Sequence, residues 1–182
     1  MPIAQDDRDK LLSLARMAVE AAVRGQTPSK PEGDTGLLGE RRGCFVTLRN
    51  GPHLRGCIGT FTPDKPLAEL IVEMAVAAAT QDPRFRATPI TPEELPELAV
   101  ELSVLSPLER TAEPEKLTPG THGVYVKRGW QSGCFLPEVA TEMGWDAEQF
   151  LDHCCAGKAG LPAGAWRSPD TEVYLFTTEK IV

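Results

Sequence analysis

The stretch CFVTLRNGPHLRGCIGT, residues 44–60, carries the strongest fold signal in the chain. Its first six residues are rich in β-branched and aromatic side chains, which is typical of a strand. Asn50-Gly51 follows, and this dipeptide favours the two-residue turn of a β-hairpin. We therefore expect the chain to return as a second strand from Leu54 to Thr60.

Periodic patterns on both sides of this hairpin predict further elements. Apolar residues recur at three- and four-residue spacing over residues 7–24 and 66–80, which predicts two amphipathic helices. Residues 98–105 alternate between apolar and polar, as in a half-buried strand. The second half repeats this order with a hairpin at 123–136, helices at 137–143 and 147–156, and a strand at 172–178. The pattern predicts an α+β fold, and the repeated order hints at internal duplication.

The bulk composition is that of an ordinary globular domain. With 182 residues, 41% of them hydrophobic, the chain suits one domain over residues 1–182, with subdomain halves at about 1–106 and 107–182. The net charge of −7 disfavours a surface coated by nucleic acid. Four arginines lie between positions 41 and 55, but solvated strand ends account for them better than a nucleic-acid patch does.

The cysteines and the N-terminus indicate a cytoplasmic protein. Five cysteines with no CxxC spacing fit neither a secreted disulfide framework nor a standard zinc site. The first residues lack the apolar core of a signal peptide, and no apolar run approaches the ~18 residues that cross a membrane. The adjacent pair Cys154-Cys155 is expected to give one sulfur to the core, since neighbouring cysteines bridge only with strain.

The segment Leu54–Gly59 is the best candidate for a functional centre. In a regular strand Arg55, Cys57 and Gly59 share one face, and a guanidinium beside a thiol lowers the pKa of that thiol. Cys57 is therefore the candidate nucleophile or soft ligand. Gly56 and Gly59 weaken a strand, so a bulge, a packed backbone or a ligand should lie close to them. The alternative is that Cys57 is a small buried hydrophobe beside a salt-bridged arginine.

Two further segments could close a site around this strand. In the first, Asp82 could orient Arg84 while Phe85 supplies an apolar wall; the alternative is a loop fixed by a surface ion pair. In the second, Glu101 lies on the polar face of its predicted strand, where it could pair with Arg55 or Arg84 at the floor of a cleft. An ordinary solvent-facing charge is the alternative for Glu101.

His122 is the histidine best suited to act as a general base or a metal ligand. A metal site made of Cys57, His122 and Glu101 would need these residues to converge, and no ligand pair stands at a recognised spacing. We therefore predict no metal, and the sequence names no cofactor.

The order of motifs resembles that of the AMMECR family. The matching blocks are CFVTL at 44–48, LRGCIG at 54–59, DPRF at 82–85, SVLSP at 103–107, HGV at 122–124 and FLPEVA at 135–140. The resemblance implies a three-layer α/β/α arrangement around a mainly antiparallel sheet with two similar halves. Bacterial and archaeal members are called AmmeMemoRadiSam system protein A, which implies radical-SAM and Memo-like partners. The motif positions carried over are Arg55, Gly56, Cys57, Gly59, Asp82, Arg84, Phe85, His122 and Gly123.

Three interpretations of the function stay open. The first is an accessory module that binds an anionic small molecule or a partner segment in a groove lined by Arg55, Cys57, Arg84 and Glu101. The second is an enzyme in which Cys57 is the nucleophile, His122 the base and Arg55 the stabiliser of negative charge. The third is a regulatory protein that binds RNA through its arginines, which the acidic net charge disfavours.

Overall fold

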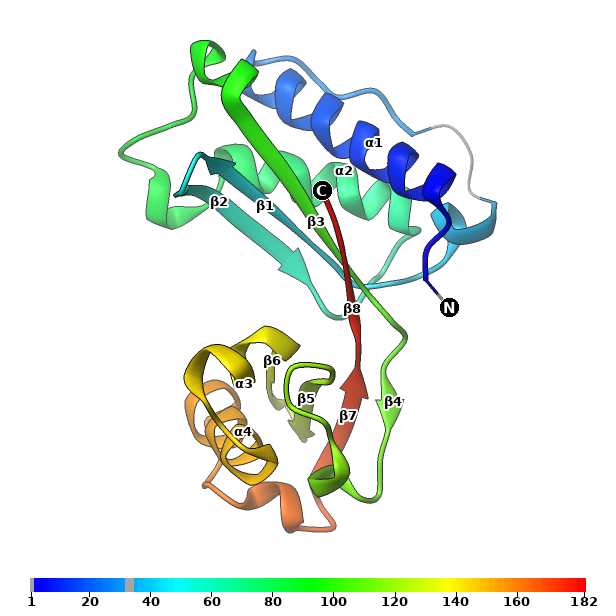
Figure 1. The fold of residues 1–182 in the computed structure, drawn as a ribbon, viewed down its shortest axis with the longest axis vertical. Coiled ribbons are helices and arrows are strands. Elements are labelled where there is room, and N and C mark those ends of the chain that lie inside the picture. The colour runs from blue at the N-terminus through cyan, green and yellow to red at the C-terminus, as the bar shows by residue number, and fades with distance from the viewer. Residues whose placement is uncertain (1, 32–34) are drawn as a thin grey trace. The chain divides into compact units, whose positions relative to one another are not determined.

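The computed structural model describes residues 2–31 and 35–182, and its helices and antiparallel sheets confirm the predicted α+β class (Figure 1). The chain forms two compact units. The first comprises residues up to Leu105 together with Glu179–Val182, and the second comprises Ser106–Thr178. The strands form two separate four-stranded sheets, one in each unit, whereas the resemblance implied a single sheet.

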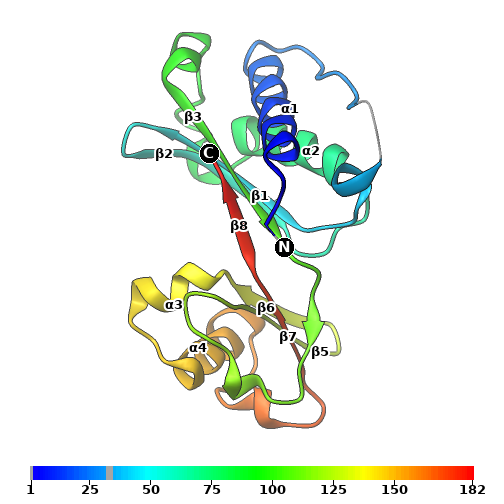
Figure 2. The same ribbon diagram turned by 45° about the vertical axis from the view of Figure 1, so that its right-hand side comes forward.

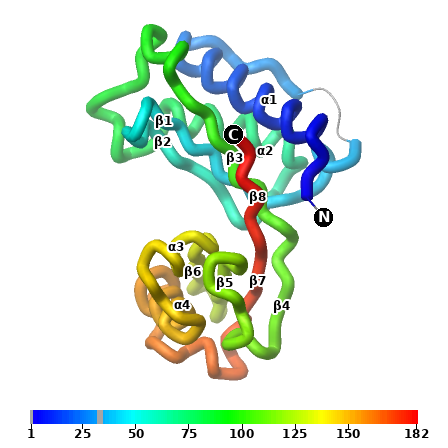
Figure 3. Tube along the Cα trace, viewed as in Figure 1, coloured from blue at the N-terminus to red at the C-terminus, as the bar shows by residue number. Residues whose placement is uncertain are grey.

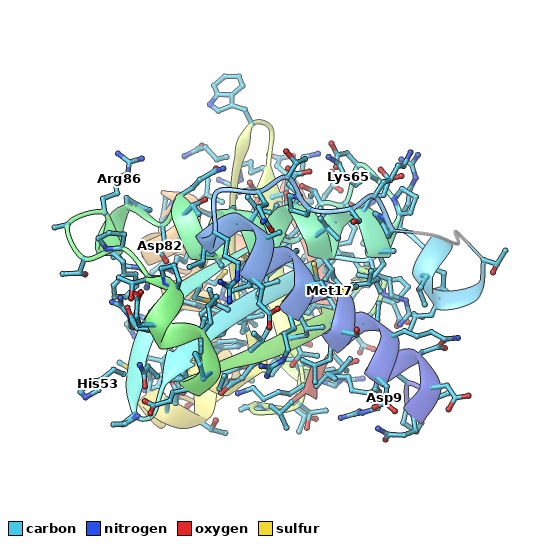
Figure 4. All side chains as sticks on the ribbon, turned by 90° about the horizontal axis from the view of Figure 1, so that it is seen from above. Asp9, Met17, His53, Lys65, Asp82 and Arg86 are labelled. Carbon is cyan, nitrogen blue, oxygen red and sulfur yellow. The ribbon has the colours of Figure 1, made fainter. Side chains whose placement is uncertain are left out.

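The first unit packs two helices on one sheet. The helices are α1 (Gln5–Val23) and α2 (Leu67–Thr80), and the strands are β1 (Cys44–Asn50), β2 (His53–Thr60), β3 (Leu98–Leu105) and β8 (Thr178–Ile181). The strand order is β2-β1-β3-β8. Seen from above, α1 and α2 lie over the strands (Figure 4), and the core forms between the two layers.

The local sequence explains both helices. Asp6 and Asp7 stand in the first turn of α1, where carboxylates favour the helix dipole, and Gly25 follows its end with a φ of +70°. Pro66 precedes α2 as its cap residue, a place where no backbone N–H is needed. The second half of α2 is rich in alanine, at Ala75 and Ala77–Ala79, so a β-strand can approach the helix closely there.

The second unit is built on the same plan. Its strands are β4 (Glu109–Arg110), β5 (Gly123–Arg128), β6 (Gln131–Phe135) and β7 (Glu172–Phe176), in the order β4-β7-β5-β6. Its helices α3 (Pro137–Met143) and α4 (Ala147–Cys154) follow the hairpin, and α4 continues into a π-helical turn at Cys155–Ala159. Asp146 caps α4 by accepting a hydrogen bond from Gln149 N at 2.9 Å.

The two sheets share a strand pattern that supports the suspected duplication. In each, a hairpin is followed by helical structure and by a strand that pairs with the first strand of the hairpin. The fourth strands come from the two segments of chain that join the units. β3 leads into β4, and β7 leads into β8. Both connections can be traced in the turned ribbon and in the Cα tube (Figures 2 and 3).

The strand expected at 172–178 is therefore two strands. β7 ends at Phe176 and β8 begins at Thr178. Thr177, between them, exchanges two hydrogen bonds with Ser106: Ser106 N donates to the Thr177 carbonyl at 2.9 Å, and Thr177 N donates to Ser106 Oγ at 3.0 Å. Sequence periodicity runs across this point without interruption, so it could not reveal the break.

One glycine in each hairpin allows a helical segment to touch the sheet. A Cβ on Gly56 would lie well under 3.0 Å from the Ala78 carbonyl oxygen of α2. A Cβ on Gly133 would collide in the same way with the backbone at Lys158 and Ala159. Both glycines contact backbone atoms, which cannot move aside as a side chain can. Each unit therefore requires a residue without a side chain at this position.

We predict that Gly56→Ala destabilises the protein by about 1–3 kcal/mol, because the added methyl group forces α2 away from β2. The measurement is urea unfolding followed by circular dichroism. Gly157→Ala is the matched control, since a Cβ at Gly157 meets no atom within 4 Å. Equal unfolding midpoints for the two variants would contradict a tight contact at Gly56.

Candidate functional site

The carboxylate of Asp82 organises the surroundings of β2. Asp82 follows α2 and is only 4% exposed. Its Oδ1 accepts hydrogen bonds from Arg84 N at 3.1 Å and from Arg84 Nε at 3.0 Å. Its Oδ2 accepts from Arg84 Nη2 at 2.7 Å and from Cys57 N at 2.9 Å. One buried carboxylate thus joins the end of a helix, a neighbouring guanidinium and a strand of the sheet.

Asp82 and Arg84 together close part of the outer edge of β2. β2 is the first strand of its sheet, so its outward backbone groups find no partner in a further strand. Cys57 N donates to Asp82, and Arg84 Nη2 donates to the Cys57 carbonyl at 3.2 Å. The two side chains do at this residue what an added strand would do. We call this arrangement, made of Asp82, Arg84 and the Cys57 backbone, the edge clasp.

The hydrogen bonds of the edge clasp stabilise the charged form of Asp82. Hydrogen bonds from the Arg84 side chain, with a further one from Cys57 N, lower the pKa of the Asp82 carboxyl from 3.8 to about 2, although burial acts in the opposite direction. The pKa of Arg84 is raised, chiefly by the hydrogen bonds to Asp82. The Arg84 side chain remains 54% exposed, so one side of its guanidinium faces solvent.

Arg55 does not lie beside the thiol of Cys57, contrary to the expectation for a regular strand. The register pairs Leu48 with Gly56 and Arg49 with Leu54, so Arg55 is an extra residue in a β-bulge. Its guanidinium forms a two-point ion pair with Glu94, with Nε–Oε2 at 2.9 Å and Nη2–Oε1 at 3.0 Å. Nη2 also donates to the carbonyls of Thr88 and Pro89. Arg55 therefore fastens the loop before β3.

Cys57 faces the side of the sheet that carries no helix. Its Sγ accepts a hydrogen bond from Thr47 Oγ1 at 3.3 Å, and Thr47 is paired in register with both Cys57 and Glu101. The neighbouring Ile58 packs against the core on the other side. Cys57 is half-buried, whereas the alternative considered for it was a small buried hydrophobe beside a salt-bridged arginine.

Glu101 continues this row across the sheet but does not pair with Arg55 or Arg84. Its Oε1 lies 3.4 Å from Arg49 Nε, and its Oε2 lies 3.2 Å from Lys180 Nζ on β8. Its side chain is 19% exposed. The four residues predicted to line one groove therefore do not line it together. Arg55 is bound to the loop before β3. Cys57 and Glu101 lie instead in a row with Thr47 on the helix-free face of the sheet.

A pocket of about 260 Å³ lies where Arg55 meets the ends of α1 and α2. Part of its wall is apolar, formed by Ala22, Val23, Ala78, Ala79 and Ile90. Phe85 also lines it, in the place expected of an apolar wall, beside Asp82 and Arg86.

Arg86 was not singled out in the sequence, and it differs from the other two arginines of this region. Its side chain points away from the body of the first unit (Figure 4), and no described residue offers it a hydrogen bond or an ion pair. Thr47 and Glu94 were also missed, because their partners are distant in sequence. The one sequence signal that could have indicated Arg86 as a site residue is its position close after Asp82 in the chain.

His122 and Gly123 belong to the second unit. His122 Nδ1 accepts a hydrogen bond from Thr118 N at 2.9 Å, which fixes the ring within its own loop. Gly123 is paired with Phe176, whose ring occupies the space of a Cβ, and Gly59 is packed by the ring of Phe45 in the same way. Packing thus gives a structural reason for both glycines.

Three of the other cysteines lie deeper than Cys57, and Cys134 is partly buried as Cys57 is. Cys44, Cys154 and Cys155 are fully buried, and all five cysteines are free thiols. Burial raises the pKa of both Cys44 and Cys134 to about 12. Within residues 2–31 and 35–182, no three His, Cys, Asp or Glu side chains are grouped to hold a metal ion, and no helix is long and apolar enough to cross a membrane.

Comparison with known proteins places this arrangement in a family. The family model described as AMMECR1 matches residues 12–181. The chain belongs to the AMMECR1 family. It is 44% identical over 185 residues to a protein of Methanothermobacter thermautotrophicus, covering 98% of this chain and 95% of that protein. It is 47% identical over 180 residues to a protein of Thermococcus kodakarensis, covering 93% and 86% respectively.

A solved AMMECR1-type relative has the same fold. The crystal structure of an uncharacterized protein from Pyrococcus horikoshii matches with a TM-score of 0.81 and 40% sequence identity, over 98% of this chain and 92% of that one.

We predict that the edge clasp makes the free energy of unfolding depend on pH in the acidic range. The folded-state pKa of Asp82 is depressed, so its contribution is complete above the unfolded value of 3.8 and is lost as the pH falls towards about 2. The loss should reach about 2 kcal/mol between pH 5 and pH 2. Urea unfolding at each pH measures it. Asp82→Asn should remove this part of the pH dependence, and Asp64→Asn, at an exposed aspartate, should keep it. An unchanged acid profile in Asp82→Asn would exclude the clasp as its source.

Proposed function

We propose that this AMMECR1-family protein is a cytoplasmic binding module that holds an acidic group in the pocket beside β2. The observation that carries the proposal is Arg86, which lines a pocket with a partly apolar wall and whose guanidinium has no ion-pair or hydrogen-bond partner among the described residues. The other charged groups there are neutralised by one another, Arg55 by Glu94 and Asp82 by Arg84. A ligand with a carboxylate or phosphate can therefore pair with Arg86 without displacing an internal ion pair.

The apolar wall limits what accompanies the acidic group. Alanines and valine from the ends of α1 and α2 offer contact area but no hydrogen bonds, while Phe85 adds a ring face. The volume of about 260 Å³ suits a small organic acid or one acidic side chain of a partner protein. As partners we propose the radical-SAM and Memo-like proteins that the family resemblance implies.

Binding is favoured over catalysis by the state of the reactive groups. In the first unit, the candidate charged side chains of the Leu54–Gly59 region, Arg55, Asp82, Arg84 and Glu101, all have internal partners. His122, the proposed base, belongs to the second unit and already uses Nδ1. A positioned general base next to the nucleophile, which a thiol enzyme requires, is absent from the described part of the first unit.

We predict that Arg86→Glu abolishes retention of an acidic ligand, because a like charge then stands at the pocket. Native mass spectrometry of gently purified protein measures the retained mass, and co-purification of the radical-SAM and Memo-like proteins measures partner binding. Arg16→Glu makes the same charge change on an exposed arginine of α1 away from the pocket, and it should retain both. Wild-type protein that retains no acidic molecule and no partner would contradict the proposal.

A second candidate function is supported by one observation: the Cys57 thiol lies half-buried on the helix-free face, beside Thr47 and next to the exposed Arg84. In this alternative, Cys57 is the nucleophile of an enzyme. It differs from the first in requiring a reactive thiolate at neutral pH.

Thiol labelling separates the two candidates. In either case we expect an alkylating reagent to modify Cys57 before the fully buried Cys44, Cys154 and Cys155, because Cys57, like Cys134, is only partly buried. Mass spectrometry of digested protein gives the rate at each cysteine from pH 5 to pH 9. A Cys57 rate that is already maximal below pH 7 supports the enzyme, whereas slow labelling that resembles a free thiol supports the binding module.

A further inference from the structure

The second unit contains a pocket of about 500 Å³ that has no part in the proposal above. It is formed by β4, the following segment to Pro114, the short 3-10 helix Ala165–Arg167 and the turn that leads into β7. Its volume lies in the range of small-molecule sites. None of its ten lining residues is acidic, in a chain with 26 acidic and 19 basic residues.

The polar groups of this pocket are donors. Three lining hydroxyls already accept hydrogen bonds from N–H groups: Thr111 Oγ1 from Glu113 N, Ser168 Oγ from Asp170 N, and Thr171 Oγ1 from Arg128 Nε. In no described bond do these hydroxyls act as donors, so each retains its O–H proton for a ligand. A pocket that offers several donors favours a ligand rich in acceptors.

Arg110 supplies the positive charge. It lies exposed on β4, and no hydrogen bond or close ion pair holds its guanidinium among the described residues, although the Glu172 carboxylate on β7 is near enough to interact with it electrostatically. The other lining arginine, Arg167, is held by Glu148 at 2.9 Å and by Asp152 at 3.6 Å. Arg110 is therefore the cation that a ligand can pair with, and its planar fork suits two oxygens of one oxyanion.

The rest of the lining is apolar and carries an aromatic ring. Two prolines, an alanine and a valine surround Trp166, which is 6% exposed. The indole is held firmly, because Trp166 Nε1 donates to Asp152 Oδ1 at 2.7 Å and Arg167 stacks on the ring at 3.9 Å from its centroid. A rigid ring edge beside prolines suits a flat, apolar ligand body.

We infer that this pocket is a second ligand site, which binds a small molecule with a phosphate or carboxylate group on a flat apolar body. Arg110 and the hydroxyls of Thr111, Ser168 and Thr171 receive the oxyanion, and the body lies against the wall that includes Trp166. The site is separate from the one at Arg86 and stands or falls independently of it.

The test is an NMR titration of the whole protein with phenyl phosphate, benzoate and benzyl alcohol, which share a ring and differ in charge. The chain has three tryptophans and hence three indole N–H signals, and Trp166→Phe assigns the one in the pocket. Phenyl phosphate or benzoate should shift the Trp166 signal in a saturable way and leave those of Trp130 and Trp145 in place. The stronger of the two acids identifies the oxyanion.

Arg110→Gln should weaken binding about tenfold or more, since a charged hydrogen-bond donor is lost. Lys127→Gln is the control, because Lys127 is exposed on β5 and does not line the pocket. The inference is overturned if neither acid shifts the Trp166 signal, if benzyl alcohol binds as tightly as the acids, or if both substitutions weaken binding equally.

Discussion

A single buried carboxylate, that of Asp82, determines how the region around β2 is built. An open sheet leaves backbone N–H and C=O groups without partners at its edge. Asp82, which follows α2, accepts four hydrogen bonds beside this edge, three from Arg84 and one from Cys57. The charge of the carboxylate is matched by the guanidinium it binds, so burial is tolerated. In this chain, the segments Leu54–Gly59 and Asp82–Phe85 are therefore joined by one set of hydrogen bonds.

The same architecture is used twice, with different side chains. Both sheets place a glycine of the second hairpin strand against helical backbone, at Gly56 and Gly133, and follow it with a cysteine. In register, Cys57 is followed across the first sheet by Thr47 and Glu101, and Cys134 across the second sheet by Tyr125 and Tyr174. The backbone constraint is thus common to the two units, whereas the chemistry on their helix-free faces is not. This contrast argues that the glycines serve the fold and that the row at Cys57 is specific to the first unit.

In this AMMECR1-family protein, the structure favours residues outside the recognised motifs as candidates for ligand binding. Arg55 and Asp82 stand in the motif segments, yet both are occupied by internal ion pairs. Arg86 and Arg110, which no motif marks, form no close ion pair with any described residue and line pockets of a size that holds small acids. Both proposed sites follow the same physical rule: a cation whose charge is not yet neutralised, beside an apolar surface, is where an anion gains most from leaving water.

The sequence by itself determined the α+β class, the hairpin at residues 44–60 and the main helices, because these depend on periodicity and turn chemistry within short windows. It also determined that Asp82 and Arg84 act together, since they are two residues apart. The tertiary structure alone decided that a bulge turns Arg55 towards Glu94, that Glu101 pairs with Arg49 and Lys180, and that the strands form two sheets. These outcomes depend on partners tens of residues away or on one inserted residue in a strand pair. Local sequence patterns reveal neither the distant partners nor the inserted residue. Such patterns predict which face of a strand a side chain occupies only where the strand register is regular.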